Sequence, residues 1–164
     1  MTIKMKEKKK KAPLNYAEGL VKARRWCALQ ERSHNEVKEK LLTYEVHYRD
    51  IQLIITELIG EGFLSEERFA KAYAGGKFRI KHWGKNKITQ QLQRKGVSEK
   101  NIETGLKEIE EKDYRNTIKK LIHKKLASVK ELNAFRKKGK LAQYLMTKGY
   151  EAELVWNILN DVIE

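Results

Sequence analysis

The chain has 164 residues and a formal net charge of +14, with 36 Lys and Arg residues against 22 Asp and Glu residues. This length accommodates one ordinary domain or a few small stacked units. Its single cysteine, Cys27, excludes an internal disulfide and a cysteine-cluster metal site. No apolar run approaches the roughly 18 to 20 residues of a membrane span, and no signal-peptide core follows the lysine-rich start, so we expect a cytoplasmic protein without a membrane partner.

Positive charge is concentrated in a few segments. Residues 1–14 are expected to form a disordered basic tail, and the pattern leaves open whether that tail is merely solvated. Residues 69–98 carry eight basic and no acidic side chains, and residues 115–149 carry a net charge of +10 with Glu131 as their only acid. An ordinary solvated surface mixes both signs. The two basic segments therefore favour binding of a polyanion.

The apolar spacing is helical almost throughout. Steps of three and four residues recur, as in Ile51, Ile54 and Leu58, and no two-residue alternation predicts a strand. Helix starts are predicted at capping boxes or single caps, and helix ends at glycines. The predicted starts are Ser33 with Glu36, Ser65 with Arg68, Ser98, and Asp113, and the predicted ends are Gly62, Gly96 and Gly149. Together these signals predict about nine helices.

A comparison of the chain with itself indicates an internal repeat. At an offset of 53, six residues from Lys85 to Gly96 fall on identical residues from Lys138 to Gly149, and at an offset of 51 Leu41 falls on Leu92. The predicted fold is therefore all-α, with three tandem three-helix repeats over residues 15–62, 63–112 and 113–164. Because units of about fifty residues are marginal alone, we expect them to pack end to end as an elongated, curved helical array with helices crossing at right angles.

Four segments resemble the RecX family of recombination regulators. They read RSHNEVKEKL at 32–41, EGFLSEERFAKAY at 61–73, WGKNKITQQLQRKGV at 83–97 and KKGKLAQYLMTKGY at 137–150. The resemblance covers nearly everything after residue 15. Its most specific residues, expected to be mostly structural, are Gly62, Phe63, Arg68, Phe69, Tyr73, Gly84, Ile88, Leu92 and Gly96.

The resemblance implies a fold and a partner. Proteins similar to this one consist of three tandem three-helix repeats, bind the RecA recombinase and lie in the groove of its filament on single-stranded DNA. They modulate, and usually inhibit, filament extension, ATP hydrolysis and strand exchange in recombination and repair. The resemblance thus implies RecA and single-stranded DNA as partners, and we expect a monomer that needs no cofactor.

Two adjacent glycines, Gly75 and Gly76, depart from the family pattern, which continues a helix there with larger residues. Each interior glycine costs roughly 1 kcal/mol relative to alanine. Either the helix bends at this point, or it ends early and KFRIKHWGK, residues 77–85, is a mobile basic connection.

The strongest candidate site is a basic ridge on the helix that contains Ile88 and Leu92. With those two residues facing the core, Lys87, Gln91 and Arg94 share one flank. Lysines and arginines bind phosphates without sequence preference, and an interleaved aromatic can stack on an unpaired base. Trp83 is the candidate for stacking, with core packing as the alternative. The other predicted nucleic-acid or filament contacts are Lys77, Arg79, Lys81, Lys85, Lys137, Lys138 and Lys140.

Catalysis is not expected. The four histidines are scattered without metal-ligand spacing, and no phosphate-binding loop or nucleophile motif is present. Two alternatives to a RecA regulator remain at this stage. One is a general nucleic-acid-binding protein that uses its repeats as helix-turn-helix modules, and the other is a scaffold whose charge serves only solubility.

Overall fold

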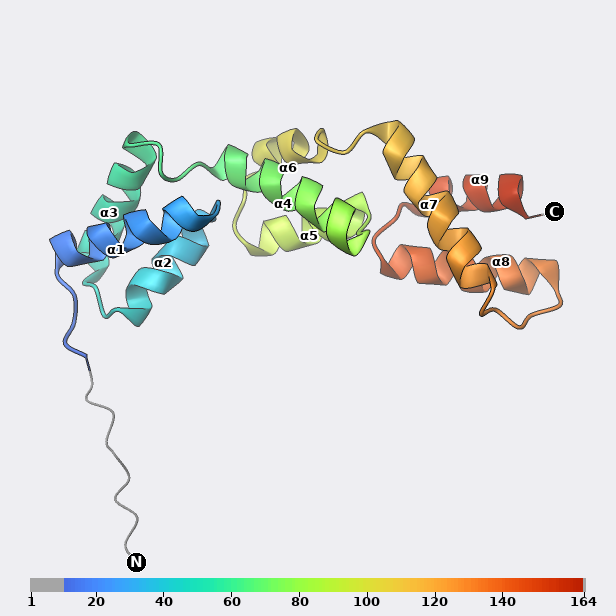
Figure 1. The fold of residues 1–164 in the computed structure, drawn as a ribbon, viewed down its shortest axis with the longest axis horizontal. Coiled ribbons are helices and arrows are strands. Elements are labelled where there is room, and N and C mark those ends of the chain that lie inside the picture. The colour runs from blue at the N-terminus through green and yellow to red at the C-terminus, as the bar shows by residue number, and fades with distance from the viewer. Residues whose placement is uncertain (1–10, 164) are drawn as a thin grey trace, which may run out of the picture. The chain divides into compact units, whose positions relative to one another are not determined.

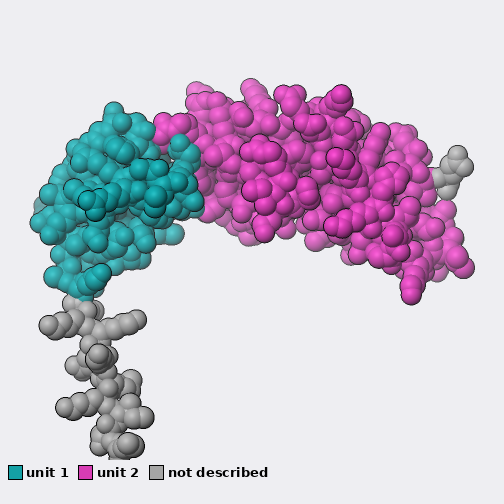
Figure 2. Space-filling model, viewed as in Figure 1, with its two compact units in different colours: residues 1–64 teal, residues 65–164 magenta. Residues whose placement is uncertain are grey.

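A computed structural model describes residues 11–163 of the chain (Figure 1). These residues form nine α-helices and no strand, which confirms the all-α prediction. They divide into two compact units, residues 1–64 and residues 65–164 (Figure 2). Most of the predicted basic tail lies outside the described residues, but Leu14 packs on the first core and donates its N–H to Tyr44 O at 3.1 Å.

Unit 1 consists of three helices around its own core. They are α1 (Tyr16–Leu29), α2 (His34–Thr43) and α3 (Tyr48–Gly60). Both α1 and α2 begin with a complete capping box, Asn15 with Glu18 and the predicted Ser33 with Glu36. The core consists of aliphatic side chains from all three helices, and the thiol of Cys27 is buried among them.

Unit 2 consists of six helices around one shared core. They are α4 (Glu66–Lys81), α5 (Lys85–Arg94), α6 (Glu99–Leu106), α7 (Glu111–Leu126), α8 (Ala134–Thr147) and α9 (Ala152–Val162). The core is continuous from Phe69 in α4 to Leu159 in α9. Helices α4–α6 and α7–α9 therefore stabilise each other by burying a common apolar surface. Among the described residues, no helix is long and apolar enough to span a bilayer.

The second helix of each repeat ends in the same way, which confirms the predicted repetition. Glu45, Gly96 and Gly149 all have positive φ angles, of 55°, 76° and 97°. The residue after each of them donates its N–H to the carbonyl five positions earlier, with N to O distances of 3.1–3.2 Å. This is the Schellman pattern of helix termination, which favours glycine. Glu45 adopts the same conformation without being glycine, so the first repeat preserves the geometry but not the residue.

Two of the four predicted helix starts differ from the structure. Asp113 lies in the first turn of α7, whose N-cap is Glu110, so the prediction of Asp113 as a cap was wrong. Ser98 is the N-cap of α6, but its hydroxyl bonds the Glu66 carboxylate at 2.8 Å instead of an α6 N–H. That carboxylate binds the start of α6 from α4, which made a local cap unnecessary.

Helix α4 continues through Gly75 and Gly76 without interruption to Lys81. The alternative of an early helix end followed by a mobile basic connection was therefore wrong. Phe78 lies beyond the glycines and is only 7% exposed in the shared core, so its burial stabilises the last turn of α4.

The two halves of unit 2 meet through a contact between two glycine backbones. A Cβ atom added at Gly84 would lie 2.2 Å from the carbonyl carbon of Gly149, and one added at Gly149 would lie 2.3 Å from Cβ of Lys87. No other residue type fits at either position without moving the backbone. The start of α5 therefore lies directly against the turn between α8 and α9.

This junction also caps α5. Gly84 has no side chain to cap the helix, and its own N–H donates to Lys148 O at 2.8 Å. The N–H of Asn86 donates to Gly149 O at 2.9 Å, and the N–H of Lys85 donates to the Tyr114 hydroxyl at 2.9 Å. The first N–H groups of a helix need partners from outside the helix, and here the third repeat supplies them.

The glycine junction can be tested by substitution. Gly84→Ala would force apart two backbones, and we expect it to lower the free energy of unfolding by about 3 kcal/mol. Gly139→Ala is the matched control, because Gly139 lies within α8 with no atom within 4 Å of the added Cβ. That control should raise stability by about 0.5–1 kcal/mol. Urea unfolding followed by circular dichroism measures both, and equal midpoints for the two variants would contradict the junction.

A second prediction concerns the Tyr114 hydroxyl, which accepts from Lys85 N–H and donates to Glu151 Oε2 at 2.6 Å. Burial, followed by the hydrogen bond to Glu151, raises the pKa of Tyr114, so the hydroxyl keeps its proton at neutral pH. Tyr114→Phe should cost about 1–3 kcal/mol because it leaves an N–H and a carboxylate without this partner. Tyr48→Phe, on an exposed side chain of α3, should change stability by less than about 0.5 kcal/mol in the same unfolding experiment.

Candidate nucleic-acid interface

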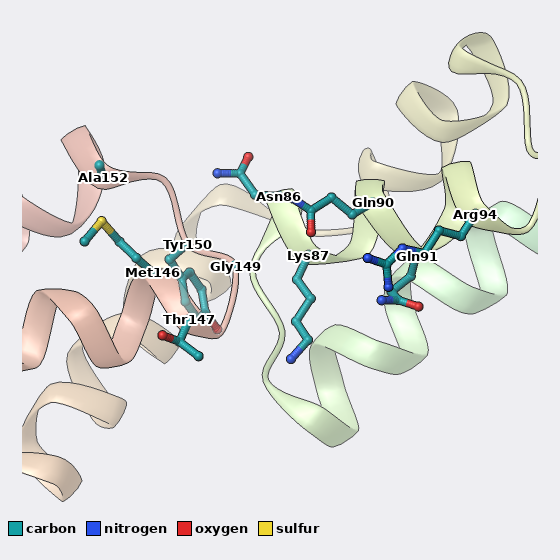
Figure 3. Close-up of a pocket in the computed structure, with 10 residues that line it drawn as sticks. All are labelled: Asn86, Lys87, Gln90, Gln91, Arg94, Met146, Thr147, Gly149, Tyr150 and Ala152. Atoms are coloured by element: carbon teal, nitrogen blue, oxygen red, sulfur yellow. The ribbon is translucent and has the colours of Figure 1, made fainter.

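The predicted ridge on α5 borders a groove. Ile88 and Leu92 are completely buried, as the helical spacing predicts. Their burial turns Lys87, Gln91 and Arg94 to the opposite side, where all three line one hollow of about 320 Å³ (Figure 3). The structure thus brings together the three residues that the sequence singled out on this helix. We call this hollow the junction groove.

The other wall of the junction groove comes from the third repeat. Met146 and Thr147 contribute from the last turn of α8, and Gly149 and Tyr150 from the turn that follows (Figure 3). The remaining lining residues are Asn86, Gln90 and Ala152, so the lining contains no carboxylate. A hollow bordered by a lysine, an arginine, amides and a hydroxyl is suited to an anion.

A row of alternating lysines and aromatic rings runs from the second repeat towards this groove. The Nζ atom of Lys77 lies 5.3 Å from the ring centroid of Tyr73 and 5.1 Å from that of Trp83. The Nζ atom of Lys87 lies 4.7 Å from the same Trp83 ring, and that of Lys95 lies 5.7 Å from the Tyr73 ring. Each distance is within the range of a cation–π contact.

The row continues in the third repeat. The Nζ atoms of Lys148 and Lys125 lie 5.6 Å and 5.2 Å from the ring centroid of Tyr144. Burial, and then repulsion from the charges of Lys87 and Lys124, lowers the pKa of the Lys148 ammonium group. We call the set Lys95, Tyr73, Lys77, Trp83, Lys87, Lys148, Tyr144 and Lys125 the basic-aromatic track. It joins the two repeats across the glycine junction.

Trp83 fits both of the roles considered for it. Its ring packs against the shared core and is half-buried, as core packing predicts. The ring also lies between the ammonium groups of Lys77 and Lys87. The exposed part of the indole therefore lies beside two cations, which is the setting in which an aromatic can stack on a base.

Four of the other predicted contact residues lie in different surroundings. Arg79 folds back over Gly75 and lines a separate hollow of about 270 Å³ together with His82, Asp113 and Lys120. Residues two positions apart on a helix point about 200° apart, so Lys77 and Arg79 cannot serve one surface. Lys81 is exposed in the last turn of α4, Lys85 pairs with Glu111 at 3.3 Å, and Lys138 bonds Asn160 at 3.3 Å.

Lys137 and Lys140 lie on α8 in the stripe that leads away from the groove. Thr147, Tyr144, Lys140 and Lys137 follow one another at steps of three and four residues, so they share one face of the helix. Lys140 pairs with Glu131 at 3.4 Å. The stripe therefore extends the polar surface of the groove along α8, with one of its two lysines partly neutralised.

The family-motif residues are mainly structural, as expected. Phe69 is buried in the shared core together with Ile88 and Leu92. Gly62 and Gly96 adopt positive φ angles at helix ends, Phe63 packs on the core of unit 1, and the N–H of Arg68 donates to the Ser65 cap. Tyr73 is the exception, because it also takes part in the basic-aromatic track.

Sequence reasoning missed half of the track. Tyr144, Lys148 and Lys125 come from the third repeat, far from Lys87 in sequence. The offset comparison placed Tyr144 on the flank equivalent to the ridge of α5, which was a usable signal. Nothing in the sequence indicates that the two flanks meet, because the glycine junction that joins them is a tertiary contact.

The described residues contain no group of three or more His, Cys, Asp or Glu side chains that could hold a metal ion. The site's chemistry is therefore that of its cations and rings. Ammonium and guanidinium groups can bind phosphates, and the flanking rings offer faces to bases, which is the combination used by proteins that bind single strands.

Comparison with known proteins identifies the repeats. One family model, the second three-helix domain of RecX, matches residues 65–106, and another, the third three-helix domain of RecX, matches residues 113–159. The regulatory protein RecX of Pelodictyon phaeoclathratiforme is 31% identical over 131 residues, which cover 80% of both chains. The RecX of Clostridium tetani is 30% identical over 134 residues, covering 80% of this chain and 61% of its own length. The RecX of Streptococcus agalactiae serotype V is 26% identical over 159 residues, covering 97% of this chain and 60% of its own length.

The chain thus spans about three fifths of the length of the Clostridium and Streptococcus relatives. Two solved structures share its fold. The crystal structure of RecX from Lactobacillus salivarius has a TM-score of 0.81 and 23% identity, covering 90% of this chain and 96% of the other. A crystal structure of a regulatory protein RecX has a TM-score of 0.77 and 23% identity, covering 89% of this chain and 73% of the other. With two of its three-helix repeats matched by family models and relatives identical at about 30% of positions, this chain belongs to the RecX family of regulatory proteins.

Proposed function

We propose that this protein binds the RecA recombinase and its filament on single-stranded DNA, and that it inhibits filament extension, ATP hydrolysis and strand exchange. Family membership supports the partner, and the observation that carries the DNA contact is the basic-aromatic track beside the junction groove. The track combines cations and rings on one surface, with no carboxylate in the groove beside it.

In this proposal the single strand follows the groove and the track. Lys87 and Arg94 contact phosphates, while Trp83 and Tyr144 present ring faces to unpaired bases. A bound phosphate would also relieve the repulsion that lowers the pKa of Lys148, because a negative charge favours the protonated amine. Lys77, Lys137 and Lys140 extend the contact to either side. Arg79, Lys81, Lys85 and Lys138 are proposed as secondary contacts, since the structure gives three of them other surroundings.

The unit boundaries favour a division of labour. Unit 2, residues 65–164, carries 23 basic and 13 acidic residues, whereas residues 11–64 of unit 1 carry eight of each. A unit without net charge has no general attraction for phosphates. We therefore assign the DNA contact to unit 2 and contacts with RecA to surfaces that include unit 1. Binding across adjacent RecA subunits would change the balance between subunit addition and loss, and would hinder entry of homologous duplex.

A general helix-turn-helix reader is less well supported. Such a protein needs polar side chains that project from its third helix towards base edges. In α6 the Asn101 amide donates to the Glu66 carboxylate, and the segment from residue 99 to residue 114 has more acidic than basic side chains. A helix with this charge is repelled by a major groove.

RecA-dependent ATP hydrolysis on single-stranded DNA tests the proposal. The protein should lower the hydrolysis rate at amounts well below one molecule per RecA, because an arrest of extension acts at filament ends. The Lys87→Ala/Arg94→Ala double variant should need roughly tenfold more protein for the same inhibition. Lys100→Ala/Lys107→Ala, which removes two exposed lysines from the segment containing α6, serves as the charge-matched control. An unchanged hydrolysis rate at saturating protein would refute the proposed function.

A salt titration tests the phosphate contacts separately. The affinity for bare single-stranded DNA should fall linearly with the logarithm of salt concentration, and each of Lys87→Ala and Arg94→Ala should reduce the slope by about 0.7. Fluorescence anisotropy of a labelled oligonucleotide provides the measurement. Slopes equal to wild type in both variants would show that these side chains do not contact phosphate.

A further inference from the structure

Two large apolar side chains in unit 2 lie in solvent beside the most basic part of the chain. Leu132, just before α8, is 100% exposed, and Phe135, in the first turn of α8, is 76% exposed. We call this pair the apolar tip. Single exposed apolar residues are common, but a fully exposed leucine three positions from an exposed phenylalanine in one turn is a local concentration that the core does not require.

The exposure is not a result of a loose connection. The same segment buries part of Leu126 and Val129 against the shared core. Asn133 caps α8 by accepting from Arg136 N–H at 3.0 Å, and the N–H of Asn133 itself donates to Glu131 Oε1 at 3.3 Å. The turn is therefore built by local hydrogen bonds that hold the backbone on both sides of Leu132.

The surroundings of the tip are cationic. Lys130, Arg136 and Lys137 follow the tip in sequence on either side, and Glu131 is the only acid from residue 115 to residue 149. The Glu131 carboxylate pairs with Lys140, and the N–H of Asn133 and this lysine lower its pKa. The one negative charge near the tip is thus already occupied by partners within the protein.

The stripe on α8 leads from the junction groove to this end of the helix. Thr147 lines the groove, and Tyr144, Lys140 and Lys137 follow towards the N-terminus of α8. The 14 residues of α8 span about 21 Å. At about 3.4 Å per stacked nucleotide, a strand of roughly six nucleotides covers that length.

We propose that the apolar tip is a second contact for single-stranded nucleic acid, in which Phe135 stacks on an unpaired base and Leu132 covers the base edge. A polynucleotide supplies both an apolar face and a negative backbone, and so matches apolar side chains set among cations. Bases in a duplex are already stacked and must be separated at a cost, whereas those of a single strand are available. The inference concerns bare DNA and does not depend on the RecA partner.

The test uses the full-length protein and fluorescein-labelled oligothymidylates of 4 and 16 nucleotides. Phe135→Ser should weaken binding of the 16-mer about tenfold, from the loss of one base stack, and Leu132→Ser should weaken it by a smaller factor. The salt slope should stay at the wild-type value because no phosphate contact is removed. Binding of the 4-mer, which is too short to span from groove to tip, should not change.

Ile80→Ser is the matched control, because Ile80 is also 76% exposed and lies between Arg79 and Lys81 in α4. It should bind both oligonucleotides as wild type does. Wild-type binding of the 16-mer by Phe135→Ser, an equal loss for the 4-mer, or no binding of the 16-mer by the unmodified protein would overturn the inference. So would a defect confined to anionic phospholipid vesicles or to DNA-free RecA, which would assign the tip to a lipid or protein surface. RecA-dependent ATP hydrolysis is measured separately, so either proposal can fail without the other.

Discussion

The close approach of Gly84 and Gly149 is the contact on which the geometry of unit 2 depends. Two backbones meet where a Cβ atom on either residue would lie within 2.3 Å of the opposite chain. The approach allows the turn after α8 to bind the first N–H groups of α5, so one repeat completes the helix cap of the other. Separation of the two repeats would expose these N–H groups along with the shared core, and the six helices therefore behave as a single unit.

The same contact explains why the basic surface can exist. Lys87 and Lys148 are brought together by the junction, and their repulsion contributes to the lowered pKa of Lys148. Like charges held close destabilise a protein unless other contacts hold them. Here burial of the common core and the ring faces of Trp83 and Tyr144 offset the repulsion. The surface is thus prepared for an anion before any anion binds.

Rings and cations in this surface belong to different helices, which makes the surface sensitive to helix placement. Lys77 in α4 and Lys87 in α5 share one ring, and Lys125 in α7 and Lys148 after α8 share another. A small shift of α5 relative to α8 would separate the two halves of the row. The glycine junction therefore positions the site as well as stabilising the fold.

The sequence by itself determined the helices, the repeat and the ridge on α5. Apolar spacing identified Ile88 and Leu92 as core, and the repeated glycine ends predicted matching helix terminations, because these signals act within a few residues. Only the tertiary structure decided that Lys77 joins the ridge while Arg79 turns away, that Lys85 pairs with Glu111, and that Tyr144 and Lys148 complete the track. The physical reason is that these outcomes depend on how two repeats meet, and that contact is made by glycine backbones, which carry no side-chain pattern for a sequence to display.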